Sequence, residues 1–449
     1  MTPSDRVLTK TAQDIIGARP ASKAIEEIFN VIHPAPPRTA LGEMFTPESA
    51  GQFLDRVANF SQLLNEDDSH ASALAKLNAA IAAAEAVRDQ VFAELFKQVR
   101  PIERSYRQLH LFFENSEVRD SVQRPPVEFH VFNADVSAIG NPTESTTVLA
   151  VNEFLEARND TFNFRQNICN LVIPGYVSDA LRKRFEDMAS AWGMLLIGDL
   201  KDEPNFKTLQ DQFRTDGGAY EFLKRPEDKA ASDVVIAGHV KLRSRHWFEE
   251  PDGHADDADL YAPASMLFAG CLARTDRTTG GGIAQGAVGM IFGQIQGVEK
   301  ARIEPRIKQM EHLTMDRQVL AIIRDDNNQL CFVGSRTQAE DPNGVMKFFT
   351  SYRVLRYLER RVAAYLRRIA EQPLGRDLVK EQVRNPIETF LDEEKKKGTI
   401  LSYELDIDMS EDKFAMGELD MKLNVLPAGP AETFRLDIEV PEFKKKADK

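Results

Sequence analysis

The stretch "ICNLVIPGYVSDALRKRFEDMASAWGMLLIGDL" (residues 168–200) decides the fold class of this chain. Its two ends, "ICNLVIP" and "MLLIGDL", are short apolar runs of the kind found in buried strands. Between them, "DALRKRFEDMASAW" spaces its apolar residues as an amphipathic helix does. Apolar strands separated by a helix predict a sheet that is covered by helices on its faces, which is the α/β class.

The same alternation of strands and helices extends on both sides of this stretch. "VEFHVFN" (127–133) and "DVVIAGHV" (233–240) are predicted to be strands. "QVLAIIRDDNNQLCFVGS" (318–335) is predicted to be a hairpin that turns at Asp326, Asn327 and Asn328. These segments place the α/β sheet in the middle of the chain.

The N-terminal part of the chain is predicted to be helical. Residues 71–99 are rich in alanine and contain no glycine or proline, so we expect a long helix that ends before Pro101. In "ERSYRQLHLFFENSE" (103–117), four apolar or aromatic residues fall on one helical face: Tyr106, Leu109, Phe112 and Phe113. The two prolines in "QRPPVEF" then mark a boundary.

The C-terminal part begins with the amphipathic helix "VMKFFTSYRVLRYLERRVAAYLRRIA" (345–370). Its arginines are expected away from the apolar stripe: Arg353, Arg356, Arg360 and Arg367. Two interpretations remain open, a solvated helix face or a surface that meets an acidic partner such as a neighbouring copy. A second helix is predicted over 376–397, with a break at Pro386 and a cap at Gly398.

Three segments with strict alternation follow this second helix. Period-two alternation with one apolar face predicts an antiparallel sheet packed on one side. Its open edges must be covered by the rest of the chain or by strands of a partner. The apolar residues of this candidate strand-exchange interface are Tyr403, Leu405, Ile407, Leu419, Met421, Leu423, Phe434, Leu436 and Ile438.

These patterns together predict a mixed α/β protein in three parts. They are a helical N-terminal region (1–120), a central α/β domain (121–344) and a C-terminal part of helices and a small antiparallel sheet (345–449).

Composition excludes several classes of function. The net charge of −13 over 449 residues argues against a general nucleic-acid binder. No apolar run reaches the length of a membrane-spanning helix, and the N-terminus has no signal-peptide pattern. Three widely spaced cysteines, Cys169, Cys271 and Cys331, fit free thiols better than a disulfide framework or a metal site. We therefore expect a cytoplasmic protein that neither inserts into membranes nor binds nucleic acid.

Motif searches find no catalytic, cofactor-binding or metal-binding residues. The glycine-rich "ARTDRTTGGGIAQGAVG" (273–289) lacks the Lys-Ser/Thr of a P-loop, and Gln285 stands where a dinucleotide fingerprint needs glycine. "HWFEEPDGHADDADLYAP" (246–263) is rich in His, Asp and Glu, but its Pro-Asp-Gly turn favours a solvated acidic loop. We expect a protein that is not an enzyme, with a nucleotide-binding α/β enzyme as the alternative.

Five segments, in order, resemble the large subunit of the type VI secretion contractile sheath, most closely its shorter variants. They are "ERSYRQLHLFFENSE", "NLVIPGYVSD", "DLYAPASMLFAGCLARTDRTTGGGIAQGAVGMIFGQIQGVE", "FVGSRTQAEDPN" and "FFTSYRVLRYLERRV", and the resemblance extends from about Arg104 to Val440. Longer members carry Trp-Arg-Gly-Leu where this chain has Tyr106, Arg107, Gln108 and Leu109.

The resemblance implies a structural protein with several partners and no cofactor. It implies a small sheath subunit, other copies of the chain in a helical polymer, an inner tube protein and an AAA+ ATPase that disassembles the contracted sheath. Strands of the small partner and of a neighbouring copy would complete the C-terminal sheet. Either the arginine-rich helix or the later segment with Lys395, Lys396 and Lys397 is the candidate for facing the inner tube, and residues 9–29 are the candidate for the ATPase handle. A phage-like tail sheath is the second alternative.

Overall fold

In the computed structural model, the described residues are 69–118, 127–132, 146–157, 168–213, 232–246, 259–278, 282–339, 344–370, 376–408, 410 and 418–430. The chain divides into two compact units, which are considered separately. One comprises Met1–Val99 with His246–Glu250, and the other comprises Arg100–Arg245 with Pro251–Lys449. The second unit contains every strand of the described chain. The three-part division expected from the sequence stays a prediction.

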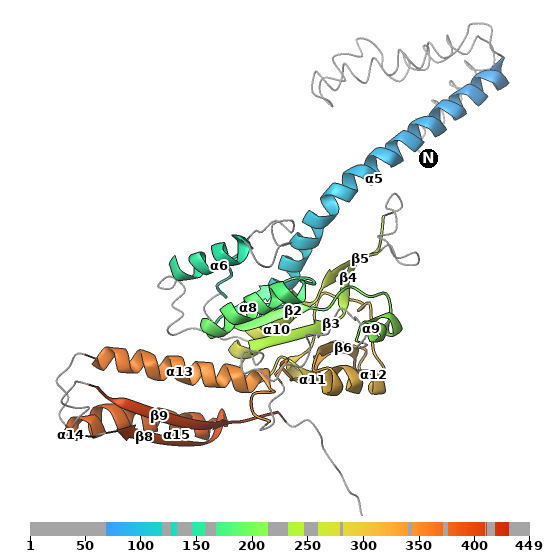
Figure 1. The fold of residues 1–449 in the computed structure, drawn as a ribbon. Helices are drawn as coiled ribbons and strands as arrows, with labels where there is room; N and C mark the ends of the chain where they lie inside the picture. Colours follow the sequence, from blue (N-terminus) through green and yellow to red (C-terminus); the bar gives the residue numbers. More distant parts are fainter. Residues whose placement is uncertain are drawn as a thin grey trace, which may run out of the picture. The chain divides into compact units, whose positions relative to one another are not determined.

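A five-stranded mixed sheet forms the centre of the second unit (Figure 1). Its strand order is β1-β2-β3-β6-β7, with the first four strands parallel and β7 antiparallel to β6. The strands are β1 (Asn170–Ile173), β2 (Leu195–Asp199), β3 (Asp233–Ala237), β6 (Leu320–Arg324) and β7 (Leu330–Val333). The α/β prediction is confirmed, including the β6–β7 hairpin, where Asn328 has a φ of 63°.

Both faces of this sheet are buried, which explains the uniformly apolar strands. One face packs against α6 (Thr146–Ala157), α8 (Asp179–Ala191) and α9 (Phe206–Gln212). The other face packs against α10 (Ser265–Arg277), the end of α5 (His70–Ser116) and the start of α13 (Phe349–Ile369). At Gly270 in α10, an added Cβ would lie 2.6 Å from the carbonyl oxygen of Phe112, so only glycine allows α10 this close to α5.

One ion pair is enclosed in the packing of this sheet. Arg182 of α8 donates from Nε to Oδ2 of Asp233 at 2.8 Å, and its Nη2 contacts Oδ1. The two side chains are 2% and 0% exposed. Gly198 of β2 gives the guanidinium its space, since an added Cβ would lie 2.6 Å from Arg182 Nη1. Helix α8 is therefore fixed to the start of β3 by a charged contact that crosses β2.

Two strand predictions are corrected. The segment 233–240 is not one strand, because β3 ends at Ala237 and Gly238 adopts a φ of 118°. The chain then enters β4 (His239–Arg243), which pairs with β5 (Leu260–Pro263) in a separate sheet. Residues 127–132 form no strand, and Phe129 instead packs against Phe112, with ring centroids 4.6 Å apart. The apolar residues that alternate with polar ones in this segment pack against neighbouring side chains, but the segment forms no hydrogen-bonded ladder with another strand.

The helix predicted to end before Pro101 continues through it, because α5 extends to Ser116. Proline removes one hydrogen-bond donor, and one missing bond does not end a helix whose later turns are packed. Within the second unit that packing comes from Leu111 and Phe112, which are buried. Tyr106 was expected on the buried face, but its side chain is 68% exposed.

The C-terminal part forms a module with its own apolar core, in which helices lie along a hairpin (Figure 1). After α13 come α14 (Arg376–Val379), a π-helical turn η4 (Lys380–Arg384), α15 (Asn385–Lys396), β8 (Ile400–Asp408) and β9 (Asp420–Pro427). The predicted break falls just before Pro386, where η4 replaces regular α-helix. Gly398, with a φ of 77°, ends α15 as expected. The third alternating segment, 434–440, lies outside the described residues.

Candidate assembly surfaces

The β8–β9 hairpin is the first candidate surface. Its strands pair antiparallel from Ile400 opposite Pro427 to Asp408 opposite Asp420, with a bulge between Ile400 and Ser402. Within the described residues this sheet has two strands, so each strand has one edge without a strand partner. Backbone groups on such edges need another strand or water. The hairpin therefore offers the template that strand addition requires.

The predicted interface side chains hold this hairpin to its own helices. Leu405 and Ile407 are buried in the same apolar core as Val354 and Leu358 of α13 and the buried residues of α15. Four others are half-buried on the same core: Tyr403, Leu419, Met421 and Leu423. The Tyr403 hydroxyl also donates to Asp392 Oδ1 at 2.8 Å. These side chains are therefore used for packing within the chain, and the backbone edges of the hairpin are left for a neighbour. Phe434, Leu436 and Ile438 lie outside the described residues.

The arginines of α13 require a correction, because two of them are buried in the same chain. Arg353 is 1% exposed and pairs with Asp276 at the end of α10. Arg360 is 9% exposed and donates to the carbonyl oxygens of Trp192 (2.6 Å) and Gly193 (3.0 Å). Burial lowers the pKa of Arg360, the largest of several influences. These side chains anchor α13 to the α/β body, a role that neither sequence interpretation included.

The lysines at the end of α15 are exposed. Lys397 Nζ lies 2.9 Å from Glu394 Oε1, and the side chains of Lys395 and Lys396 are exposed beside it. That hydrogen bond is the main reason the pKa of Lys397 is raised. The three positions thus present charge to the solvent, as a tube-facing role requires.

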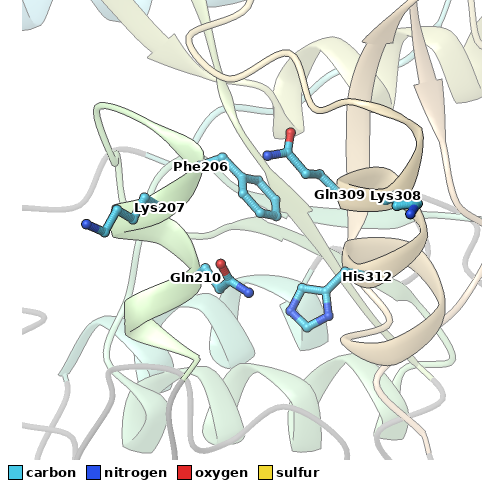
Figure 2. Close-up of a pocket in the computed structure, with 6 residues that line it drawn as sticks. All are labelled: Phe206, Lys207, Gln210, Lys308, Gln309 and His312. Carbon is cyan, nitrogen blue, oxygen red and sulfur yellow. The ribbon is translucent and has the colours of Figure 1, made fainter.

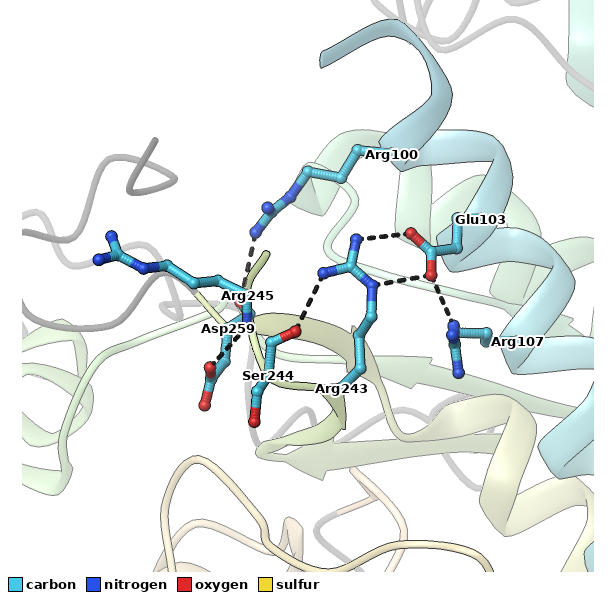
Figure 3. Close-up of polar contacts among 7 residues, drawn as sticks. All are labelled: Arg100, Glu103, Arg107, Arg243, Ser244, Arg245 and Asp259. Carbon is cyan, nitrogen blue, oxygen red and sulfur yellow. Dashed lines mark hydrogen bonds and ion pairs between the residues drawn. The ribbon is translucent and has the colours of Figure 1, made fainter. Parts of the chain in front are cut away.

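A cluster of charged residues joins the last turns of α5 to β4 and β5 (Figure 3). Glu103 accepts two hydrogen bonds from Arg243, at 2.8 and 2.7 Å, and one from Arg107 at 2.8 Å. The bond from Arg243 is the largest influence lowering the Glu103 pKa, to about 2. Asp259 pairs with Lys241 Nζ at 2.6 Å and accepts from the Arg245 backbone N–H at 3.0 Å. This end of the acidic segment 246–263 is therefore held by basic partners; residues 247–258 lie outside the described range.

Asp199, at the carboxyl end of β2, occupies the edge where ligands bind in many α/β proteins. Its carboxylate is buried and accepts backbone N–H bonds from Gly175 (3.0 Å), Ala264 (2.9 Å) and Ser265 (2.9 Å). Burial outweighs these bonds and raises its pKa to about 6. The group joins two loops of the same chain and starts α10, so it acts as a structural carboxylate.

The shift at Asp199 predicts a pH dependence of stability. Since the pKa rises from 3.8 to about 6 on folding, its contribution is fully present below pH 3.8 and is lost as the pH rises through 6. We expect the free energy of unfolding of the wild type to include a decrease as the pH rises through this range. The variant Asp199→Asn should lack this decrease. Urea unfolding followed by circular dichroism across this window measures both slopes. An unchanged slope in the variant would contradict the assignment.

The glycine-rich segment follows the end of α10, and its described part does not form a phosphate-binding loop. The Gly282 N–H donates to the Thr275 carbonyl at 3.0 Å, and Gln285 N–H donates to Gly282 at 3.0 Å. Gly282 has a φ of 114° and Gly289 a φ of 76°. These glycines serve a backbone path that other residues rarely adopt.

A shallow cleft of about 360 Å³ lies between α9 and α12 (Ile307–Glu311), which continues into the π-helical η3 (His312–Asp316). Its lining is Phe206, Lys207, Gln210, Lys308, Gln309 and His312 (Figure 2). Lys207 and Lys308 extend away from its centre in that view. Sequence reasoning did not find this cleft, because its two sides are about a hundred residues apart and neither carries a motif.

The described part of the chain also lacks the dinucleotide crevice and the metal-ligand cluster that many α/β enzymes use. The parallel strands follow one another in sequence order across the sheet, without the reversal that creates a dinucleotide crevice. No group of three or more His, Cys, Asp or Glu in these residues is arranged to hold a metal ion.

No helix of the described residues is long and apolar enough to cross a membrane. The cysteines are unpaired, with Cys271 and Cys331 buried and Cys169 half-buried.

In the described residues, a mixed α/β body is joined by the anchored helix α13 to the β8–β9 hairpin. The model of the family "Type VI secretion system TssC/VipB, central domain" matches residues 94–337, more than half of the chain. The chain belongs to this family and is a contractile sheath subunit. No match was found among curated proteins.

Solved structures with a similar fold come from contractile injection systems. A chain of the anti-feeding prophage (AFP) baseplate, 6-fold symmetrised, has a TM-score of 0.50 at 17% identity, over 75% of this chain and 80% of that one. The contracted AFP helical sheath has a TM-score of 0.48 at 18% identity, over 67% and 75%. The contracted PVC sheath complex of an extracellular contractile injection system has 0.47 at 14%, over 60% and 70%. The first of these supports the fold described above.

Proposed function

We propose that the chain polymerises, with a smaller sheath subunit and with other copies of itself, into a cytoplasmic helical tube around an inner tube. Contraction of this sheath would propel the inner tube outward, and an AAA+ ATPase would then disassemble the contracted form. The observation that carries the proposal is the β8–β9 hairpin, which has two strand edges without a strand partner among the described residues. Strands from the small subunit and from a neighbouring copy would complete this sheet.

Strand addition suits a polymer that must change shape. Backbone hydrogen bonds between copies hold neighbouring subunits together, while the α/β bodies remain free to change their mutual orientation. The apolar face of the hairpin is already packed on α13 and α15, so a joining strand needs only the edge. Residues 9–29 remain the proposed ATPase handle.

Negative-stain imaging of the chain co-produced with the products of its neighbouring genes tests this proposal. We expect long tubes that contain a small second sheath protein and enclose an inner tube. Tubes built from one sheath protein type alone would favour a phage-like tail. The absence of tubes in every combination of neighbouring proteins would overturn the proposal.

Charge reversal at Lys395, Lys396 and Lys397 tests the proposed contact with the inner tube. The side chains are exposed, and such pairs are worth only about 0–1 kcal/mol each, so the tube can slide free during contraction. We expect the triple Lys→Glu variant to form sheaths of normal length in which fewer contain an inner tube. Counting filled and empty sheaths measures this effect. If the variant forms no sheaths, the lysines belong to a contact between sheath subunits.

A further inference from the structure

We propose that residues 282–289, at the end of the glycine-rich segment, form a strap that positions the C-terminal module (α13 to β9) on the α/β body. By holding the module at one angle, the strap determines where the open edges of the β8–β9 hairpin point. The contacts that carry this inference lie within one chain and exist before any assembly, so they are independent of the proposed polymer.

The body and the module have separate apolar cores. The body core lies against the central sheet and includes Phe268 and Phe332, whereas the module core is built around residues such as Leu391 and Ile407. Among the described residues, only α13 and the strap contribute side chains to both cores. A module that is held by one helix can turn about that helix, and a second apolar contact with the body resists the turning.

Two residues at the start of the strap pack on the module core. Ile283 and Ala284 are half-buried, and every other described residue of that core lies between 354 and 425. Backbone bonds fix this part of the strap, because the Gln285 N–H donates to the Gly282 carbonyl and the Gly282 N–H donates to the Thr275 carbonyl, both at 3.0 Å. The strap is therefore the one described part of the body that enters the module core.

The next residues of the strap belong to the body core. Ala287 is fully buried in that core, and Val288 is half-buried against it. Gly286 lies between the two anchors and passes close to the first turn of α13, since an added Cβ would lie 3.2 Å from Phe349 Cζ and 3.4 Å from Thr350 Cγ2. Residues 283–288 thus carry the chain from one core to the other, beside the start of the helix that joins them.

Glycine at the two ends of the strap is required by backbone conformation and not by lack of space. Gly282 has a φ of 114° and Gly289 a φ of 76°, values that residues with a side chain rarely adopt. Outside the adjoining residues, no heavy atom lies within 4 Å of a Cβ added at either position. A small side chain there would disturb the path of the strap and leave the packing around it unchanged.

The angle of the module is important for assembly because the hairpin belongs to the module. Leu405 and Ile407 of β8 are buried in the module core, so the hairpin turns together with it. A joining strand must lie alongside an edge to form its backbone hydrogen bonds. Edges that already point in one direction reduce the ordering cost of binding, so a firmly held module should assemble more readily.

Pulsed electron paramagnetic resonance between two spin labels measures how firmly the module is held. The labels are attached at Lys183→Cys on α8 and Lys395→Cys on α15, both exposed positions, in a chain that also carries Cys169→Ser. The two other cysteines are buried and should not react. We expect Ile283→Ser to broaden the distribution of label distances about twofold, because it removes the larger strap contact with the module core.

Two sets of variants serve as controls. Ile291→Ser removes the same side chain from a position of α11 (Gly289–Phe292) that is 80% exposed, so its distance distribution should match that of the labelled wild type. Gly289→Ala should broaden the distribution, whereas Gly289→Asn should not, because asparagine tolerates positive φ better than alanine does. Rescue by asparagine would assign the effect to the backbone path of the strap.

Thermal unfolding separates this role from a purely structural one. A purely structural role would lower the midpoint of unfolding and leave the distance distribution of the folded variant unchanged. That result, or equal broadening by Ile283→Ser and Ile291→Ser, would overturn the inference. If Ile283→Ser does not fold, Ile283→Ala makes the same test with a smaller loss of contact.

Assembly provides a second readout. With the products of the neighbouring genes, Ile283→Ser should reduce mean sheath length in negative-stain images by about threefold. Sheaths of wild-type length from a chain with a broadened distance distribution would overturn the role of the strap in assembly. Absence of sheaths with the unchanged chain would contradict the proposed function, whereas the label distances would still test the strap.

Discussion

Asp233→Ala is expected to lower the free energy of unfolding by about 3–5 kcal/mol, because it removes the hydrogen-bonded carboxylate partner of a buried guanidinium. Arg182 is 2% exposed and reaches Asp233 across Gly198, so water cannot replace the lost carboxylate. That loss is a large fraction of the total stability of a typical domain, about 5–15 kcal/mol. Urea unfolding followed by tryptophan fluorescence and circular dichroism measures it.

Two control variants distinguish the buried charge from a loss of side-chain volume. Glu153→Ala removes an exposed carboxylate from α6 and should change the free energy of unfolding by less than about 0.5 kcal/mol. Arg182→Met combined with Asp233→Leu replaces both charges with apolar groups and should be more stable than Asp233→Ala alone. A single variant within about 1 kcal/mol of the wild type would show that the pair is not needed.

Disrupting the β8–β9 hairpin is expected to abolish long sheaths. Removing residues 399–449 deletes both strands, but it also removes Leu405 and Ile407 from the apolar core that they share with α13 and α15. Proline at a single strand position is therefore the more specific change, since it removes one backbone donor; at the exposed Asp420 it leaves the apolar core in place, whereas at Met421 it also removes one half-buried core side chain. We expect the truncated chain to form no long sheaths, and proline at Asp420 or Met421 to shorten them.

Adjacent N–H groups of β9 point to opposite edges, so the two proline variants should differ. The variant that removes a donor from the open edge should assemble less well while its thermal stability stays closer to that of the wild type. The other loses a bond to β8 and should be less stable. Asn424→Thr changes an exposed side chain and keeps its N–H, so sheath length should not change. Full-length sheaths from the truncated chain would disprove strand exchange.

The sequence predicted those parts of the fold whose signals are local. The β6–β7 hairpin followed from two apolar runs around Asp326, Asn327 and Asn328, and the strands β8 and β9 from strict alternation. The junction at Gly238 was missed because two strands of different sheets follow each other with one residue between them. The continuation of α5 past Pro101 was missed because packing, and not propensity, sustains that turn.

The roles of the α13 arginines depend on contacts that are distant in the sequence. Asp276 is 77 residues from Arg353, and Trp192 is 168 residues from Arg360. Periodicity assigns charged residues to the solvent side and contains no information on such partners. Periodicity therefore predicted the position of α13 correctly. It placed Arg353 and Arg360 in solvent, whereas both are buried.

The anchoring of α13 determines how mechanical load passes through the subunit. One helix of 21 residues, about 30 Å long, is tied to the α/β body by Arg353 and Arg360 and to the hairpin core by Val354, Leu358 and Val362. If a neighbouring subunit pulls on the hairpin as proposed, the force would pass along this helix to the central sheet. Because the helix is rigid, mechanical work done by one subunit would reach the next, whereas a flexible linker would absorb part of it by extending.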